Sequence, residues 1–269
     1  MSKILANFHT HSIICDGKDS PEEMVLEAIA KGFHTLGFSG HGYTDFDLRY
    51  CVRDIPAYLA EIRRLKEKYR DKITVLVGLE EDAFELVDRT QVDYIIGSMH
   101  YFYKDGKYFS IDGSREYFAE CLEVFNHDVI QMAETYYSAF CEYILRRKPD
   151  IIGHFDLITK FEDVDGPFFL DNPKYHEIAE KYLLQAIKSE CIFEVNTGAI
   201  ARGYRTSPYP HERLLYLLKK EGAKIILTSD CHKKEMLDCA FEETKNYLQE
   251  IGFHKVCLLT EDGVKEQDL

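Results

Sequence analysis

Three things are scarce in this sequence: long apolar runs, closely spaced cysteine pairs and basic residues. No apolar run approaches the roughly 18 residues that a membrane-spanning helix needs, so no membrane span is expected. The eight cysteines include no C-x-x-C pair, and we interpret them as reduced thiols that mostly fill the core. Lys and Arg number 33 against 47 Asp and Glu. The resulting net charge of −14 disfavours binding to a nucleic-acid backbone.

The first residues contain no apolar leader. The segment MSKILANFHTHS reaches a histidine-rich motif before a signal segment could form, so we expect a cytoplasmic protein. The length of 269 residues fits one α/β barrel, and the absence of repeats, low-complexity tracts and linkers predicts a single domain over 1–269. With 45% hydrophobic residues, such a domain can build a sizeable core. Nothing in the sequence demands an oligomer, and a monomer is sufficient.

Short apolar runs alternate along the chain with longer segments of helical periodicity. The runs predict strands at 3–8, 34–39, 73–79, 92–97, 150–153, 191–195, 224–229 and, with a weaker pattern, 255–259. The periodic segments predict helices at about 20–31, 54–69, 114–147 (in two pieces), 173–189, 209–221 and 234–251. Ser20 and Asn172, each followed by proline, are helix start signals, and Gly32 and Gly222 are stop signals. Seven or eight such units favour a closed parallel barrel, with its chemistry at the C-terminal ends of the strands.

Histidines and carboxylates gather at those predicted strand ends. Six of the eleven histidines lie there, together with three carboxylates: His9, His11, His41, His100, His154 and His232, with Glu80, Glu194 and Asp230. A single histidine at such a position is more often a hydrogen-bonded polar residue than a ligand. Many of them at one rim are costly to bury unless cations pair them, and divalent metal ions select these ligand types. The sequence therefore predicts a metal cluster.

Local spacing supports that interpretation. In His9-x-His11, alternate side chains of an extended segment point the same way, so both can reach one ion, and we expect Asp230-x-His232 to repeat this geometry. The same alternation turns Cys231 away, which favours core filler over a soft metal ligand. Asp16 follows the first strand and is either a turn residue or a ligand. Its position among the histidines and carboxylates of the strand ends favours a ligand.

Taken in order, these segments resemble the PHP (polymerase and histidinol phosphatase) family of metal-dependent phosphoesterases. The matching segments are FHTHSIICDG, GFSGH, VGLEED, IGSMH, IIGHFDL, EVNTG and TSDCH, which span residues 8–232. The resemblance implies one phosphoesterase domain over 1–269. It also implies a distorted (β/α)7 TIM-like barrel, with the metal site at the C-terminal ends of the strands. Three divalent ions are implied as well, and Zn, Mn and Fe all suit such ligands.

By the same resemblance the ligands divide into three sets, with Glu80 bridging the first two ions. The sets are His9, His11, Glu80 and Asp230; Glu80, His100 and His154; and Asp16, His41 and His232. Hydroxide formed between two of the ions would attack phosphorus in line. The implied reaction is hydrolysis of a small phosphomonoester, and the expected substrate is L-histidinol phosphate.

Charged and aromatic residues near other strand ends are candidates for contact with that substrate. Arg202 suits bidentate contact with phosphate and Lys160 supplies a point charge, although either residue could instead be a solvated surface cation. The residues expected to act in the reaction are Asp16, Glu80, Lys160 and Arg202. The residues expected to bind substrate are Lys160, Arg202, Asp45, Asp82 and Tyr101.

Other chemistries fit the sequence less well. Cys141 and Arg147 have the C-x5-R spacing of cysteine phosphatases, but the residues between them are helical and lack the glycine of a phosphate loop. Two further hypotheses stay open. One is a PHP phosphoesterase that acts on nucleotides, nucleic-acid 3′ ends or another small phosphomonoester. The other is a non-catalytic metal-binding protein, which would predict lost ligands, and none is lost.

Overall fold

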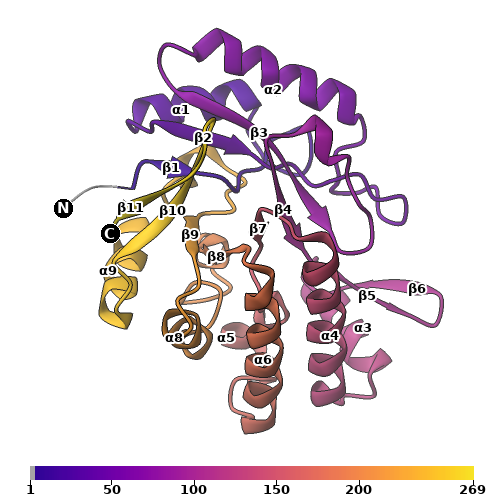
Figure 1. Ribbon diagram of the computed structural model, residues 1–269. Coiled ribbons are helices and arrows are strands. Elements are labelled where there is room, and N and C mark those ends of the chain that lie inside the picture. Colours follow the sequence, from indigo (N-terminus) through magenta and orange to yellow (C-terminus); the bar gives the residue numbers. More distant parts are fainter. Residues whose placement is uncertain (1–3) are drawn as a thin grey trace.

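A computed structural model describes residues 4–269, and its centre is a nearly closed barrel of seven parallel strands (Figure 1). In spatial order the strands are β1 (Ala6–Asn7), β2 (Thr35–Phe38), β3 (Thr74–Asp82), β4 (Tyr94–Ser98), β7 (Ile151–Ile152), β8 (Ile192–Asn196) and β9 (Ile225–Thr228). Beyond β1 and β9, Thr10 and Cys231 form a parallel bridge that links the two outer strands. The predicted (β/α)7 barrel is confirmed, and residue 3 of the first predicted strand lies outside the described residues.

Helices lie around the outside of the strands (Figure 1). They are α1 (Pro21–Ala30), α2 (Ile55–Tyr69), α3 (Arg115–Val124), α4 (Val129–Arg147), α5 (Glu162–Asp165), α6 (Pro173–Ala186), α7 (Gly198–Ala201), α8 (Glu212–Lys220) and α9 (Phe241–Ile251). The predicted start signals are confirmed, because the side chains of Ser20 and Asn172 cap α1 and α6. Gly32 and Gly222, with φ of 81° and 69°, follow the ends of α1 and α8 as predicted. Within residues 4–269, no helix is both long enough and apolar enough to span a bilayer.

Several predicted boundaries are corrected by local contacts. The helix predicted at 209–221 begins only at Glu212, because Tyr209 pairs with Asn196 as an antiparallel bridge. The helices predicted to end at 189 and to begin at 234 are shorter, and 3₁₀ turns occupy Ile187–Ser189 and Lys234–Met236. Further 3₁₀ turns lie at Arg89–Gln91 and Leu157–Thr159. The segment predicted as two helices is indeed divided, at Asn126 and His127, which have φ of 52° and 59°.

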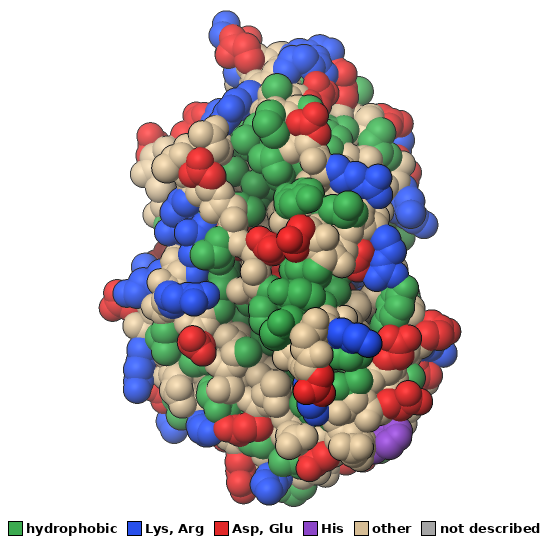
Figure 2. Space-filling view, turned by 90° about the vertical axis from the view of Figure 1, so that its right-hand side faces the viewer, with side chains coloured by type: hydrophobic (Ala, Val, Ile, Leu, Met, Phe, Trp, Pro, Cys, Tyr) green, Lys and Arg blue, Asp and Glu red, His purple; other side chains and the backbone are tan. Residues whose placement is uncertain are grey.

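Two antiparallel hairpins lie outside the barrel. β5 (Tyr101–Lys104) pairs with β6 (Lys107–Ser110), and β10 (Lys255–Thr260) pairs with β11 (Gly263–Asp268). The apolar run at 255–259 is thus a strand, but it belongs to a ribbon and not to the barrel. Asp-Gly at 105–106 and at 262–263 is the turn signal that could have identified both hairpins. Figure 2 shows the side of the molecule from which the β5–β6 hairpin projects.

The barrel interior below the C-terminal strand ends is packed and apolar. Tyr94 crosses it, and its hydroxyl donates to the carbonyls of Phe8 at 2.6 Å and Phe38 at 3.1 Å. Gly37 and Gly78 make room for this ring, since a Cβ at either position would collide with it. This packing leaves the C-terminal ends of the strands as the place for a polar site.

Candidate metal centre

The ends of β1, β3 and β9 bring two histidines and two carboxylates to one point. Nε2 of His9 lies 3.2 Å from Oε2 of Glu80 and 3.6 Å from Oδ1 of Asp230. Nε2 of His11 lies 3.6 Å and 3.2 Å from the same two oxygens. All four side chains are buried. The two imidazoles point the same way, as their spacing predicts, and four ligand atoms surround one space.

Three of these ligand atoms form no hydrogen bond in the described part of the chain. Nε2 of His9, Nε2 of His11 and Oε2 of Glu80 are buried without a hydrogen-bond partner among residues 4–269. Each buried unpaired polar atom costs about 1–3 kcal/mol, which a bound cation would remove. Burial, with the neighbouring imidazoles of His232 and His41, lowers the pKa of His11 to about 3. Its ring is therefore neutral at physiological pH and keeps a lone pair for a metal ion.

Glu80 faces a second pair of histidines with its other oxygen. Oε1 lies 3.2 Å from Nε2 of His100 and 3.0 Å from Nε2 of His154, and it accepts a hydrogen bond from Ser98 at 2.6 Å. Burial opposes ionisation of Glu80, but the imidazoles around it hold its pKa well below the usual value. An ionised carboxylate with one oxygen toward each set of histidines is suited to bridge two ions.

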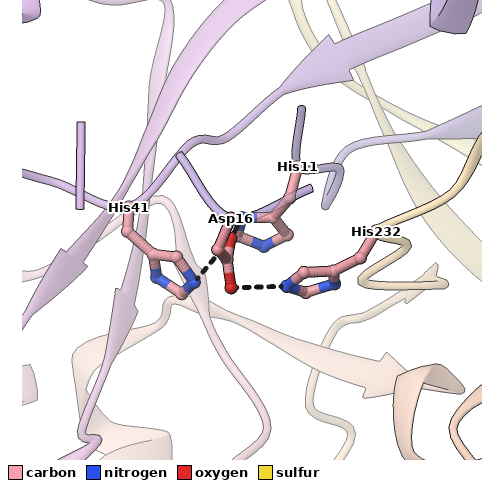
Figure 3. A group of neighbouring side chains, drawn as sticks. All are labelled: His11, Asp16, His41 and His232. Atoms are coloured by element: carbon pink, nitrogen blue, oxygen red, sulfur yellow. Dashed lines mark hydrogen bonds and ion pairs between the residues drawn. The ribbon is translucent and has the colours of Figure 1, made fainter. Parts of the chain in front are cut away.

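A third group of predicted ligand side chains lies at the rim of the barrel (Figure 3). Oδ2 of Asp16 is 3.1 Å from Nε2 of His232, and Oδ1 is 3.7 Å from Nε2 of His41. His11 closes this group, with its Nδ1 3.7 Å from Oδ1 of Asp16. The structure therefore brings all nine predicted ligand side chains into one continuous cluster. How they divide among individual ions stays a prediction.

Behind His9 lies a buried carboxylate that orients it. Oε1 of Glu194 is 2.5 Å from Nδ1 of His9 and accepts from Thr228 at 2.7 Å, while its Oε2 accepts from the backbone N–H of His154 at 2.7 Å. Burial alone would lower the pKa of His9, but Glu194, Glu80 and Asp230 raise it. A carboxylate behind a ligating histidine holds the ring and increases its basicity. The strand-end position of Glu194 is the sequence signal for this role.

Asp82 occupies the same position behind His100. Its Oδ2 accepts from the backbone N–H of His100 at 3.0 Å and lies 3.2 Å from Nδ1 of the ring. The side chain is buried and does not line the cavity described below. Its placement therefore favours support of His100 over the predicted contact with substrate.

The segment around Asp230 departs from the predicted geometry. Asp230 has φ of 45°, so Asp230-x-His232 is not an extended pair that points one way. The turn directs Asp230 toward His9 and His11 while His232 faces Asp16. Cys231 is buried among apolar side chains that include Leu237, as predicted for core filler.

A cavity of about 530 Å³ opens over the cluster, and three of the five residues predicted to bind substrate line it: Lys160, Arg202 and Tyr101. Arg202 donates to Oδ2 of Asp230 at 2.9 Å, and its Nε is buried without a partner among residues 4–269. Nζ of Lys160 lies 3.3 Å from Oδ2 of Asp112. Burial lowers the pKa of Lys160, and Asp112 acts in the opposite direction. Both cations are thus held at the cavity wall by carboxylates.

The sequence predictions missed other residues of that wall. Asp45 is exposed outside the cavity, whereas Asp47, two residues later, lines it. Asp47 accepts from the Tyr101 hydroxyl at 2.8 Å and pairs with Arg49. Asp112 also lines the cavity and follows the unpredicted β5–β6 hairpin, which would have indicated it. No sequence signal separates Asp47 from Asp45, because both lie in one polar loop.

The cysteine-phosphatase spacing has a structural explanation. Cys141 is buried inside α4, and burial raises the pKa of its thiol. Arg147 donates from Nε and Nη2 to the Glu81 carboxylate at 2.8 and 2.7 Å. Neither residue is available to bind phosphate.

Comparisons with known proteins identify the family of the chain. The PHP domain family matches residues 7–198. A histidinol-phosphatase of Lactococcus lactis subsp. lactis is 27% identical over 98% of this chain and 96% of its own length. The Schizosaccharomyces pombe protein named "Probable histidinol-phosphatase" is 28% identical over 95% of this chain and 89% of its own.

Solved structures show the same fold. The crystal structure of the Lactococcus lactis histidinol phosphate phosphatase, complexed with zinc, L-histidinol and phosphate, aligns with a TM-score of 0.73 at 21% identity. The alignment covers 97% of this chain and 98% of that one. The family match includes most of the barrel and seven of the nine clustered side chains, all except Asp230 and His232. This chain belongs to the PHP domain family.

Proposed function

We propose that this protein is a metal-dependent phosphomonoesterase that hydrolyses L-histidinol phosphate to L-histidinol and phosphate, a reaction of histidine biosynthesis. Relatives with the name histidinol-phosphatase match nearly the whole chain. A structural neighbour binds zinc, L-histidinol and phosphate. The observation that carries the proposal is the set of buried ligand atoms on His9, His11 and Glu80 that have no hydrogen-bond partner among residues 4–269, with Glu80 itself lining the cavity.

We infer that three divalent ions, zinc, manganese or iron, bind this cluster. The ligand sets would be His9, His11, Glu80 and Asp230; Glu80, His100 and His154; and Asp16, His41 and His232. Divalent ions in such a site activate a water molecule as nucleophile and neutralise charge on the phosphoryl oxygens. Histidine and carboxylate ligands suit all three metals.

The residues around the cluster prepare it for a phosphate group. Glu194 and Asp82 hold the rings of His9 and His100, so these ligands need little reorganisation. Arg202 offers its unpartnered Nε. Lys160 offers an ammonium group that Asp112 already holds. Preorganised cations favour the charge that develops on the phosphoryl group.

The alcohol part of the substrate would lie against the outer wall of the cavity. Asp47 and Asp112 supply carboxylates there for an amine, and Tyr101 supplies an aromatic surface for an imidazole ring. Asp47, and not the predicted Asp45, would therefore be the acidic residue of this loop within reach of substrate.

Phosphate release from a panel of substrates tests the proposal. The panel contains L-histidinol phosphate, a simple aryl phosphate, nucleoside monophosphates and a 3′-labelled single strand, with metal content measured on the same preparation. We expect the highest kcat/KM with L-histidinol phosphate. A higher kcat/KM with a nucleotide, or degradation of the strand, would instead support the alternative substrate class.

A pair of histidine variants tests the role of the metal cluster. His9→Ala should lose bound metal and phosphate release together, whereas the matched control His254→Ala, at an exposed position, should lose neither. Unchanged phosphate release from a metal-depleted His9→Ala protein would overturn the proposal.

A further inference from the structure

Two loops at the C-terminal strand ends carry the cations of the cavity wall. Lys160 follows the 3₁₀ turn Leu157–Thr159 after β7, and Arg202 follows the four-residue helix α7 after β8. Such short elements do not hold their shape alone, because isolated helices below about 12 residues are marginal in water. The two cations also repel each other, since burial lowers the pKa of Lys160 and the charge of Arg202 adds to this effect. Contacts between the loops are therefore needed to hold both cations at one wall.

Arg205 and Asp156 supply a buried contact of this kind. Both side chains are fully buried, and neither lines the cavity. Nη1 of Arg205 lies 3.9 Å from Oδ2 of Asp156, and the same nitrogen donates to the hydroxyl of Thr159. Thr159 directly precedes Lys160, and Arg205 lies three residues after Arg202. One guanidinium group thus connects the chain segments that carry the two cations.

Further contacts join the same two loops. Oδ2 of Asp156 accepts from the backbone N–H of His211 at 2.8 Å, just before α8. Oδ2 of Asp163 accepts from the backbone N–H and the hydroxyl of Thr206 at 2.7 and 2.9 Å. A small apolar cluster also takes residues from both loops: Leu157, Ala199 and Tyr209. The loops after β7 and β8 therefore form one packed unit around the Asp156–Arg205 pair.

Stability alone is a poor explanation for a charged pair at this place. Nε of Arg205 and Oδ1 of Asp156 are buried without a hydrogen-bond partner among residues 4–269. Buried ion pairs are often no more stabilising than apolar side chains of the same volume, and their best documented use is to fix the register of two segments. Register matters here, because Lys160 and Arg202 must reach one small anion together.

We propose that Arg205 and Asp156 are positioning residues for phosphate binding. Their pair holds the loop of Lys160 in register with the loop of Arg202, so that both cations reach the same phosphate group. Neither positioning residue lines the cavity, so they act through the two cations and not on phosphate itself. A displacement of about 1 Å in such a site can cost about 10²-fold in rate. The inference rests on the proposed phosphate site but not on which alcohol carries the phosphate.

Calorimetric titration of the metal-loaded protein with inorganic phosphate tests the proposal, with metal content measured on the same preparation. Removal of one charge would leave the other buried and unpaired, so the main variant is the double Asp156→Asn, Arg205→Met. We expect the Kd for phosphate to rise about tenfold or more, and kcat/KM for a simple aryl phosphate to fall about 10²-fold, at wild-type metal content. The control Glu180→Gln, Arg213→Met removes a partly exposed ion pair between α6 and α8 and should leave both constants unchanged.

A merely structural pair predicts a different result. A folded double variant with the wild-type Kd for phosphate would overturn the proposal, however low its unfolding midpoint. If the double variant does not fold, Thr159→Val decides, because it removes the hydroxyl that accepts from Arg205 and leaves both charges in place. Its Kd for phosphate should rise about threefold or more, and an unchanged Kd would overturn the proposal. A wild-type protein that binds no phosphate would overturn this inference and the proposed function together, whereas phosphate binding without hydrolysis of L-histidinol phosphate would contradict the proposed substrate alone.

Discussion

The two ends of the barrel are built in opposite ways. At the C-terminal ends of the strands, the buried groups include imidazoles and carboxylates, and several of their nitrogen and oxygen atoms have no hydrogen-bond partner among residues 4–269. Below them, Tyr94 packs among apolar side chains such as Ile151 and Ile226, and its one polar atom donates to backbone carbonyls. The comparison teaches that one end stabilises the fold while the other keeps ligand atoms free for ions. Substitutions at the two ends should therefore change different properties.

Removal of the bridging carboxylate should have the largest effect. Glu80→Gln keeps the shape but cannot present two charged oxygens, so metal content should fall. Phosphate release should fall on the order of 10³-fold, the upper range for the loss of one electrostatic contact in a hydrolytic site. Metal analysis and phosphate release on one preparation measure both. Glu67→Gln, exposed on α2, is the control. Unfolding of the Glu80→Gln protein would show that the polar end also supports the fold.

Tyr94→Ala should produce the converse result. It leaves a cavity in the barrel interior and should lower the free energy of unfolding by about 3 kcal/mol. Metal bound per folded chain should stay unchanged. Urea denaturation with metal analysis measures the two properties. Loss of metal without loss of stability would contradict the division between the two ends.

Glu194→Gln should have an intermediate effect. It weakens the hydrogen bond that orients His9 but removes no ligand, so metal affinity should fall about 10- to 100-fold. Competition with a chromophoric chelator measures the affinity. The control is Glu190→Gln, which is exposed in the turn before β8. Wild-type affinity in Glu194→Gln would mean that packing alone orients His9.

Cys231→Ala should have the smallest effect. The thiol packs among apolar side chains, so its loss should cost about 1 kcal/mol of unfolding free energy. Metal content and phosphate release should match the wild type. Loss of one ion per chain would instead make the sulfur a ligand.

Much of this architecture could be predicted from local patterns. Apolar runs and capping signals such as Ser20 and Gly32 depend on neighbours in the sequence, and the structure confirms them. The barrel then explains why His9, His100 and His154 lie together, because parallel strands end at one rim. The β5–β6 hairpin, and with it Asp112, was missed although an Asp-Gly turn marks it.

Other features depend on contacts between distant segments. The left-handed backbone at Asp230 directs its carboxylate toward His9 and His11, and no residue nearby in the sequence requires this conformation. Asp82 was predicted to bind substrate, but its hydrogen bond with His100 makes it a support for that ring. Asp47 lines the cavity in place of Asp45, because the Tyr101 hydroxyl holds it there.

By itself, the sequence determined the alternation of strands and helices and the residue types delivered to the strand ends, since both follow from periodicity and local chemistry. Only the tertiary structure decided which oxygen of Glu80 faces which histidines and which carboxylates stand behind the ligands. Those outcomes depend on distances between segments far apart in the chain, and such distances exist only once the barrel has closed.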